Sequence, residues 1–384
     1  MRYIVYILIV GALIGSYFNI LPGLTWSDVT SIPLLVISVL KYIQKKWKVD
    51  AFCRLSALYL PFMLISATVN ADITNTIFIN YFRNYFYGIL VYFALSNSIR
   101  SIKDIKRFML FASVYLVVFL LNFRSMAINT QYYTLDTLDF GYGRNNVAFT
   151  ALLMAIVFEF LYYSKIVKAY ILVGVVLMAF IILFCASRYA MIMLLVSFIL
   201  FRVFYKKISL YEILTLTGLA LISIYIFRHL TSTIDSSFVE YSQNYLKDKV
   251  YGAGQDFFST RIMSINVIPI SETFSTGNIL INLIFGKPLA IQHSFFSHTL
   301  ITTGIFGFMC YITAHLKQLV LAYKYKGIYF FLFIVVLVMF INDFITNATF
   351  IVGVNSMLYG AICAVLYNFI KINENANISK RVCN

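Results

Sequence analysis

Charged side chains are scarce in this sequence. They make up only 12% of its 384 residues, whereas 61% of the residues are hydrophobic. A soluble globular domain is about one quarter charged, so this composition excludes one and indicates that lipid is the main solvent. The apolar runs are long and do not alternate as the roughly 10-residue strands of a membrane barrel do. Because lipid tolerates only helices or closed barrels, the runs predict membrane-spanning helices.

Several motifs of soluble enzymes are also missing. There is no DxD for a metal-bound nucleotide sugar, no GxxxxGKS/T phosphate loop and no HExxH metal site. The five cysteines are scattered without metal-ligand spacing, which also argues against a disulfide framework. We therefore expect no metal and no cofactor. The formal charge of +15 lies mainly in short loops between apolar runs, so it indicates membrane topology and no nucleic-acid partner.

The apolar runs predict an all-α fold, a polytopic integral membrane helical bundle with about 12 transmembrane helices. Neither an internal repeat nor a low-complexity segment is evident, so residues 1–384 are expected to form a single integral membrane domain. The first run lacks a signal-peptide cleavage site and is expected to stay in the protein. The expected spans are 3–21, 30–44, 55–70, 77–98, 108–123, 145–163, 167–186, 189–205, 209–228, 296–316, 328–345 and 350–370.

Lysine and arginine give the predicted bundle an orientation. Cytoplasmic loops are enriched in these residues, and with the N-terminus inside, most of the 30 fall on the inner side. An even number of spans then puts both termini in the cytoplasm. The connections are short except for a long periplasmic loop at 229–295 and a smaller periplasmic loop at 124–144. Apolar residues throughout 229–295 predict short helices packed on the bundle, and long loops of this kind are often functional.

An arginine is expected inside the fourth span, at position 83. Asn80, Arg83, Asn84 and Tyr87 recur at helical spacing and form one polar face about two turns in from the outer surface. A charge within the membrane costs several kcal/mol, so such a residue is a functional candidate. The structural alternative is an arginine that extends to the outer interface or pairs with a carboxylate of a neighbouring helix.

Three further arginines are expected on the same outer side. Arg144 precedes the sixth span, Arg188 opens the eighth, and Arg261 lies in the long loop. The planar arginine fork suits phosphate, and a lipid-linked diphosphate would lie at this depth. Helix N-termini near positions 145 and 189 would add backbone N–H groups to the same anion. Anchoring to ordinary lipid headgroups is the alternative for these arginines.

The sequence has only four histidines. His293 and His298 lie where the long loop re-enters the membrane, whereas His229 and His315 lie at span ends and are expected to be structural. A neutral imidazole is suited to taking a proton from a sugar hydroxyl near neutral pH. A hydrogen-bonded structural histidine is the alternative for His293 and His298. His298 lies roughly one and a half helical turns from His293 and is expected to point elsewhere.

The residues around His293 form a pattern that is found elsewhere. His293-Ser294 is followed by nine residues and then by Gly304, with Gly307 three positions further on. This closely resembles a motif of the O-antigen polymerase and O-antigen ligase superfamily. In that motif a His is followed by Asn, Ser or Gln, then by nine residues and a Gly, and three positions further on by Gly, Thr or Tyr. The N-terminal third of the chain resembles the superfamily only in its hydropathy.

Three more segments resemble motifs of that superfamily, in the same order. One departure is Tyr189, where the superfamily often has Gly. The segments are Gly143-Arg144-Asn145-Asn146 at a helix entry, Cys185-Ala-Ser187-Arg188 at a helix start, and Ser259-Thr-Arg261 with Ile-Phe-Gly286 in the long loop.

The resemblance implies a metal-independent glycosyltransferase that uses an undecaprenyl-diphosphate-linked oligosaccharide as donor. It implies that His293 is the catalytic general base and that Arg188 and Arg261 bind the substrate diphosphate. The charge argument adds Arg83 and Arg144 to the diphosphate-binding residues. The two glycines of the motif at His293 are expected to let the tenth span pack closely on a neighbour.

The favoured function is that of an O-antigen polymerase of the cell inner membrane. It would transfer the growing glycan from undecaprenyl diphosphate to the terminal sugar of a new lipid-linked repeat at the periplasmic face. The alternatives are an O-antigen ligase that transfers the glycan to lipid A-core, a lipid-linked oligosaccharide flippase, and a structural membrane scaffold. The expected partners are the lipid-linked oligosaccharide and membrane lipid; whether a polysaccharide chain-length regulator is a further partner is left open.

Overall fold

The computed structural model is helical through most of the chain that it describes. It divides into two compact units. Unit 1 comprises Met1–Phe119 with Ser264–Asn384, and unit 2 comprises Leu120–Met263. The described residues are 2–21, 24–70, 74–128, 144–163, 171–185, 188–205, 270–271, 279–287, 295–324, 333, 336–338, 340–341 and 353–382.

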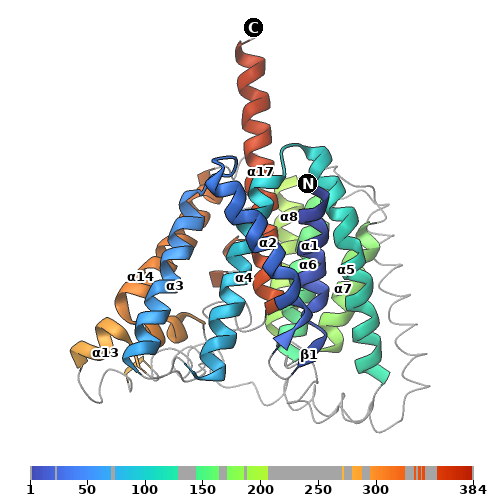
Figure 1. The fold of residues 1–384 in the computed structure, drawn as a ribbon. Coiled ribbons are helices and arrows are strands. Elements are labelled where there is room, and N and C mark those ends of the chain that lie inside the picture. The colour runs from blue at the N-terminus through green and yellow to red at the C-terminus, as the bar shows by residue number, and fades with distance from the viewer. Residues whose placement is uncertain are drawn as a thin grey trace. The chain divides into compact units, whose positions relative to one another are not determined.

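Unit 1 is a helical bundle, in agreement with the all-α prediction (Figure 1). Within the described ranges, α2, α3, α14 and the Gly353–Glu374 part of α17 are long and apolar enough to cross a membrane, which identifies a membrane protein. The total of about 12 spans stays a prediction. The described helices of this unit are α1 (Arg2–Gly15), α2 (Trp26–Ile43), α3 (Ala51–Val69), α4 (Thr76–Ser98), α13 (Ile279–Phe285), α14 (Phe295–Lys324), α17 (Gly353–Val382) and the part of α5 (Ile102–Ile128) up to Phe119; the rest of α5 belongs to unit 2.

The first helix is shorter than the sequence predicts. α1 ends at Gly15, and a small antiparallel pair of strands follows, β1 (Asn19–Leu21) with β2 (Leu24–Thr25). The prediction continued the first span to residue 21 because residues 17–21 are largely apolar. A Cβ atom on Gly15 would lie 2.6 Å from the backbone nitrogen of Ser27, so glycine lets the end of α1 approach the start of α2.

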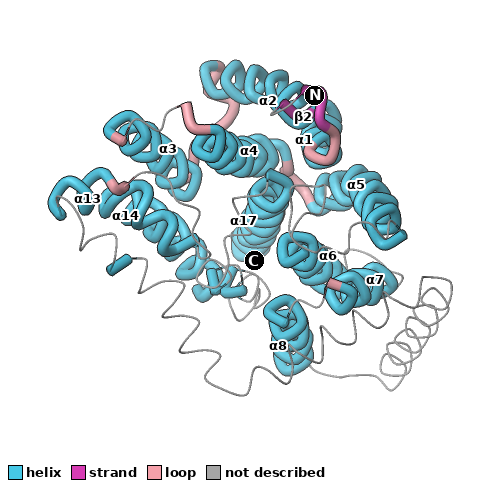
Figure 2. The backbone as a smooth tube through the Cα atoms, turned by 90° about the horizontal axis from the view of Figure 1, so that it is seen from below, coloured by secondary structure: helices cyan, strands magenta, loops and turns pink. Residues whose placement is uncertain are grey.

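The two helices at the centre of unit 1 are α4 and α17, which lie side by side (Figure 2). Their backbones approach closely at two glycines, Gly88 and Gly360. A Cβ atom on Gly88 would lie 2.8 Å from the carbonyl oxygen of Ser356, and one on Gly360 would meet the carbonyl oxygen of Gly88. Small residues at helix contacts permit such packing in membrane proteins, where lipid tails give no hydrophobic drive for association.

The starts of α1, α3 and α5 and the end of α4 lie at one end of unit 1. The side chain of Asn97, near the end of α4, accepts a hydrogen bond from the Lys48 N–H at 2.9 Å and donates one to the Lys48 carbonyl oxygen at 3.1 Å. Asp50 caps α3 by accepting the Cys53 N–H at 2.7 Å. The beginning of α1 and the C-terminal end of α17 lie at this same end (Figure 1).

An ion pair joins α1 to α5 at this end. Arg2 Nη1 lies 3.1 Å from Asp104 Oδ2. Burial acts to raise the pKa of Asp104, but hydrogen bonds from the Arg100 N–H and the Ser101 hydroxyl, together with the Arg2 charge, outweigh it. The pKa of Asp104 is therefore held below its usual value, and the carboxylate is charged at neutral pH.

Unit 2 contains α6 (Arg144–Tyr163), α7 (Ile171–Phe184) and α8 (Arg188–Tyr205). A Cβ atom on Gly174, near the start of α7, would lie 2.8 Å from the ring of Phe158, near the end of α6. These two helices are therefore antiparallel. Only three residues separate the end of α7 from the start of α8, which makes those two antiparallel as well. It follows that α6 and α8 run in the same direction.

Several predicted features lie outside the described residues. They include the span at 209–228, most of the span at 328–345 and most of the periplasmic loop at 229–295. Inside that loop, α13 is a short helix that packs on α14 and α3, as the apolar residues of the loop predict. The smaller loop, expected from residue 124, begins later because α5 continues to Ile128.

Candidate functional site

The residues predicted to form the site are described to different extents. Arg83 is described with its side chain, on α4. Arg144 and Arg188 are described as the first residues of α6 and α8. Arg261 and His293 lie outside the described residues, so their diphosphate-binding and catalytic roles stay predictions.

Arg144 and Arg188 lie at the same end of unit 2. Each begins a helix, and the two helices run in the same direction with α7 packed against both. A hydrogen bond of 3.5 Å from Ser197 Oγ on α8 to Glu159 Oε2 on α6 connects the two helices directly. Helix N-termini carry partial positive charge and unsatisfied N–H groups. The first turns of α6 and α8, each of which begins with an arginine, therefore lie at the same end of unit 2; a diphosphate site there stays a prediction.

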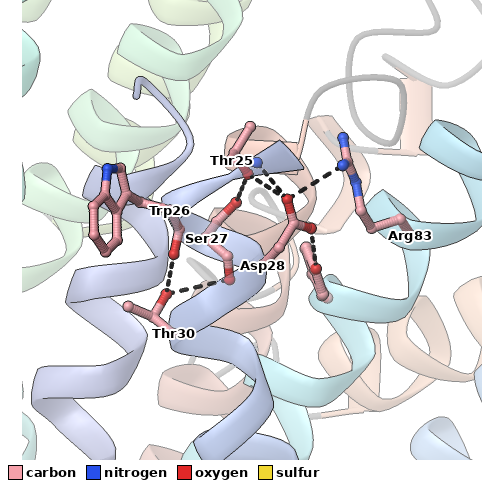
Figure 3. Close-up of polar contacts among 7 residues, drawn as sticks. Thr25, Trp26, Ser27, Asp28, Thr30 and Arg83 are labelled. Atoms are coloured by element: carbon pink, nitrogen blue, oxygen red, sulfur yellow. Dashed lines mark hydrogen bonds and ion pairs between the residues drawn. The ribbon is translucent and has the colours of Figure 1, made fainter. Parts of the chain in front are cut away.

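Arg83 is held by a carboxylate on a neighbouring helix. Its Nη1 lies 3.3 Å from Oδ2 of Asp28, the third residue of α2 (Figure 3). Tyr87, one helical turn further along α4, donates its hydroxyl to Asp28 Oδ1. The side chains of Arg83 and Tyr87, which the sequence places on one polar face, thus meet at one acidic partner. This pairing is the structural alternative considered for Arg83.

Asp28 is fixed from its own helix as well. Its Oδ2 accepts the Thr25 N–H at 2.6 Å and the Thr25 hydroxyl at 2.9 Å (Figure 3). A threonine before a helix with an acidic residue three positions later is the sequence pattern of a capping box. That pattern, Thr25-Trp26-Ser27-Asp28, is the signal that marks Asp28 in the sequence. Four donors thus converge on this carboxylate, from Arg83, from Tyr87 and from the N–H and hydroxyl of Thr25.

The tenth expected span is broken at the motif glycine. α14 contains one residue with non-helical backbone angles, Gly304, with φ 65° and ψ −170°. Only glycine adopts this region readily. A Cβ atom on Gly304 would also lie 2.8 Å from the Leu283 carbonyl oxygen and would collide with the Ile284 backbone, both on α13. The sequence predicts close packing here but a continuous helix, because residues on both sides of the glycine have the same helical apolar pattern.

A second glycine of the motifs, Gly286, packs against α14 just before the break. Gly286 follows α13 with φ 75°, and a Cβ atom there would lie 2.6 Å from the carbonyl carbon of Thr302. The next residue, Lys287, donates its N–H to the Ile301 carbonyl oxygen at 2.8 Å. Ser66 of α3 donates its hydroxyl to the Thr302 carbonyl oxygen. Carbonyl groups near the break thus gain partners from α3 and from the residue after α13, which stabilises the broken helix.

His298 is buried near this break. Only 1% of the residue is exposed, and its ring centroid lies 4.4 Å from that of Tyr81 on α4. Phe295 stacks on Tyr81 at 5.6 Å, so the start of α14 is held against α4 by aromatic contacts. The sequence did not assign a functional role to His298. Whether it points away from His293 stays a prediction, since His293 lies outside the described residues.

His315 has the structural role expected from the sequence. Its Nδ1 lies 2.7 Å from the hydroxyl of Tyr359 on α17, and its ring packs 4.2 Å from that of Tyr311. The imidazole therefore ties α14 to α17 inside the bundle. Among the described side chains, no three His, Cys, Asp or Glu residues lie close enough to share a metal ion.

Comparisons of the chain with family models, with curated proteins and with solved structures return no match.

Proposed function

We propose that this chain is a membrane glycosyltransferase that polymerises O-antigen repeat units at the periplasmic face of the cell inner membrane. The donor is a glycan on undecaprenyl diphosphate, and the acceptor is the terminal sugar of a new lipid-linked repeat. The membrane character of the described helices supports a lipid-linked substrate. The specific chemistry rests on the residues that resemble the O-antigen polymerase and ligase superfamily.

The contact between the segment that ends at Gly286 and the segment around Gly304 is the observation that carries this proposal. Both glycines belong to segments that resemble superfamily motifs, and both have positive φ values. Each lies where a Cβ atom would collide with the other segment. Two short motifs that are unconnected by sequence would not be expected to meet at the two positions that demand glycine. Their meeting supports the view that the motifs work as one site.

The arrangement of α6 and α8 supports a diphosphate site. Arg144 and Arg188 begin two helices that run in the same direction within unit 2. Guanidinium groups and helix N-termini both favour phosphate oxygens. Arg188 and Arg261 are proposed to bind the donor diphosphate, with Arg144 beside them. Arg83, which is neutralised by Asp28, would contribute only if the diphosphate competes with that carboxylate.

The proposed reaction needs one base and one good leaving group. His293 takes the proton from an acceptor hydroxyl as its oxygen bonds to the anomeric carbon of the donor glycan. The bond between that carbon and the diphosphate oxygen breaks, and undecaprenyl diphosphate leaves with the electron pair. Arg188 and Arg261 stabilise the negative charge that grows on the leaving group. The energy comes from the glycosyl diphosphate itself.

Deletion of the gene followed by gel analysis of lipopolysaccharide tests the proposal. A polymerase predicts that the deletion strain makes core carrying a single repeat, with the ladder of longer chains lost. Bare core with accumulated lipid-linked polymer would instead identify a ligase. Loss of lipid-linked repeats from the periplasmic face would identify a flippase.

A further inference from the structure

A cluster of positive charge lies where α1 and α5 begin, at one end of unit 1 (Figure 1). Arg2 of α1 pairs with Asp104 of α5, and Arg107 Nη1 lies 4.0 Å from Oδ1 of the same carboxylate. Asp104 is the one acidic residue in the segment 100–107, so its single charge cannot neutralise the cations around it. The basic residues of this segment are Arg100, Lys103, Lys106 and Arg107.

The basic side chains of the cluster are accessible. The side chains of Arg2 and Arg107 are 44% and 43% exposed, although both approach Asp104. Lys103 and Lys106 are exposed as well, and in the described part of the chain neither lysine forms an ion pair. The cluster therefore offers two guanidinium groups and two ammonium groups to an anion from outside the chain.

The face of α5 that carries these cations becomes apolar two turns further along. Leu110 lies seven residues after Lys103, and Val114 lies seven residues after Arg107. Seven residues make nearly two full turns and about 10 Å of helix, so each apolar side chain lies on the same face as its cation. Leu110 is 72% exposed and Val114 is 52% exposed. A change from cations to apolar side chains over this distance matches the passage from lipid headgroups to hydrocarbon.

Aromatic contacts between α1 and α5 hold the cluster in place. The rings of Tyr6 and Phe108 lie 5.5 Å apart, and those of Tyr3 and Phe111 lie 6.1 Å apart. The guanidinium carbon of Arg107 also lies 5.7 Å from the centroid of the Tyr3 ring, within the range of a cation–π contact. Because these contacts and Asp104 restrain the arginines, less conformational entropy is lost when they bind an anion.

We propose that this cluster binds cardiolipin, a phospholipid with two phosphates and four acyl chains. Arg2 and Arg107 bind one phosphate, Lys103 and Lys106 bind the other, and the acyl chains lie against the exposed apolar face of α5. Two phosphates can engage both groups of cations, whereas the single phosphate of phosphatidylglycerol leaves one group without a partner. The site lies within unit 1 and is independent of the function proposed above.

Binding of cardiolipin to the purified full-length protein in detergent, measured by native mass spectrometry, tests this site. The double variant Lys103→Ala, Lys106→Ala is expected to bind roughly tenfold to thirtyfold more weakly, because each cation near an anionic headgroup contributes about a factor of five to affinity. Lys103→Arg, Lys106→Arg should retain most of the affinity. The matched control is Lys46→Ala, Lys48→Ala, which removes two exposed lysines at the same end of unit 1 and should change the affinity less than about threefold.

Melting temperatures without added lipid show whether the variants are folded. All of them should melt near the wild-type temperature, since the substituted lysines are exposed. Wild-type protein should also bind cardiolipin at least about tenfold more tightly than phosphatidylglycerol.

Three results would overturn the cardiolipin site. The first is an unchanged cardiolipin affinity in folded Lys103→Ala, Lys106→Ala. The second is an equal loss of affinity in the control variant, which would show that the whole charged end of the unit attracts anionic lipid without a defined site. The third is equal affinity for cardiolipin and phosphatidylglycerol, which would identify a site for a single phosphate.

Discussion

Arg83 on α4 forms an ion pair with Asp28 on α2, with 3.3 Å between Nη1 and Oδ2. The two residues are 55 positions apart in the sequence. Tyr87 and Thr25 are the other donors to the carboxylate. A charged residue that sequence reasoning assigns to substrate is thus also part of the framework of the bundle.

Asp28→Asn is expected to lower the stability of the protein. The substitution removes the negative charge that lies 3.3 Å from the partly buried Arg83 guanidinium, which costs about 1–3 kcal/mol after allowance for the partial exposure of Arg83. Thermal unfolding in detergent measures the effect. The loss of stability in the double variant Asp28→Asn, Arg83→Gln should be smaller than the sum of the losses in the two single variants. Strict additivity would show that the pair contributes nothing.

Gly304→Ala is expected to destabilise the fold strongly. Its φ of 65° with ψ −170° costs a non-glycine residue about 1–3 kcal/mol, before any clash with α13. Gly11→Ala is the matched control, because a Cβ atom there would make an ordinary contact 3.4 Å from Thr30 Cγ2. That control should be neutral or slightly stabilising, since alanine favours helix over glycine by about 1 kcal/mol. Equal melting temperatures for the two variants would argue against the break in α14.

The ion pair of Asp104 with Arg2 should stabilise the folded protein at neutral pH and lose this effect in acid. The pKa of Asp104 is depressed in the folded protein, so its contribution is present above the unfolded-state pKa and is lost as pH falls through the folded-state pKa. The size is at most about 1 kcal/mol, because Arg2 is largely exposed. Asp104→Asn should therefore lower the melting temperature at neutral pH, and the difference from wild type should shrink as the pH falls through the depressed folded-state pKa of Asp104. A melting-temperature difference between the two proteins that persists in acid would show that the substitution acts through packing and not through the charge of Asp104.

Arg188→Lys is expected to lower glycan transfer by roughly tenfold to a hundredfold. A lysine keeps the charge but cannot offer two parallel hydrogen bonds to a phosphate. Arg202→Lys, near the other end of α8, is the matched control and should keep normal activity. Transfer rates of purified variants on a lipid-linked repeat give the comparison. Full activity of Arg188→Lys would indicate an interfacial anchor in place of a diphosphate ligand.

The positions of most helices could be predicted from the sequence. Each apolar run needs enough residues to cross the membrane, so its centre is evident from hydropathy alone, and α3, α4 and α6 begin within a few residues of their expected starts. The strands β1 and β2 were missed because the residues after Gly15 are as apolar as those before it. The break at Gly304 was missed for a related reason. Its cause is a long-range contact with α13, which no local pattern contains.

The candidate site was predictable in part. The arginines and the glycine motifs are visible in the sequence as residue types that are costly in a membrane or unusual in a helix. The partner of Arg83 depends on which helices touch, although the capping-box pattern at Asp28 was available as a signal.

The most direct test of the account uses purified protein in vesicles with an undecaprenyl-diphosphate-linked repeat as the only substrate. Wild-type protein is predicted to convert the repeat into a ladder of longer lipid-linked chains. His293→Ala should give no ladder while keeping the melting temperature of the wild type, and His229→Ala should give a normal one. A normal ladder from His293→Ala, or the absence of any ladder from folded wild-type protein, would contradict the account.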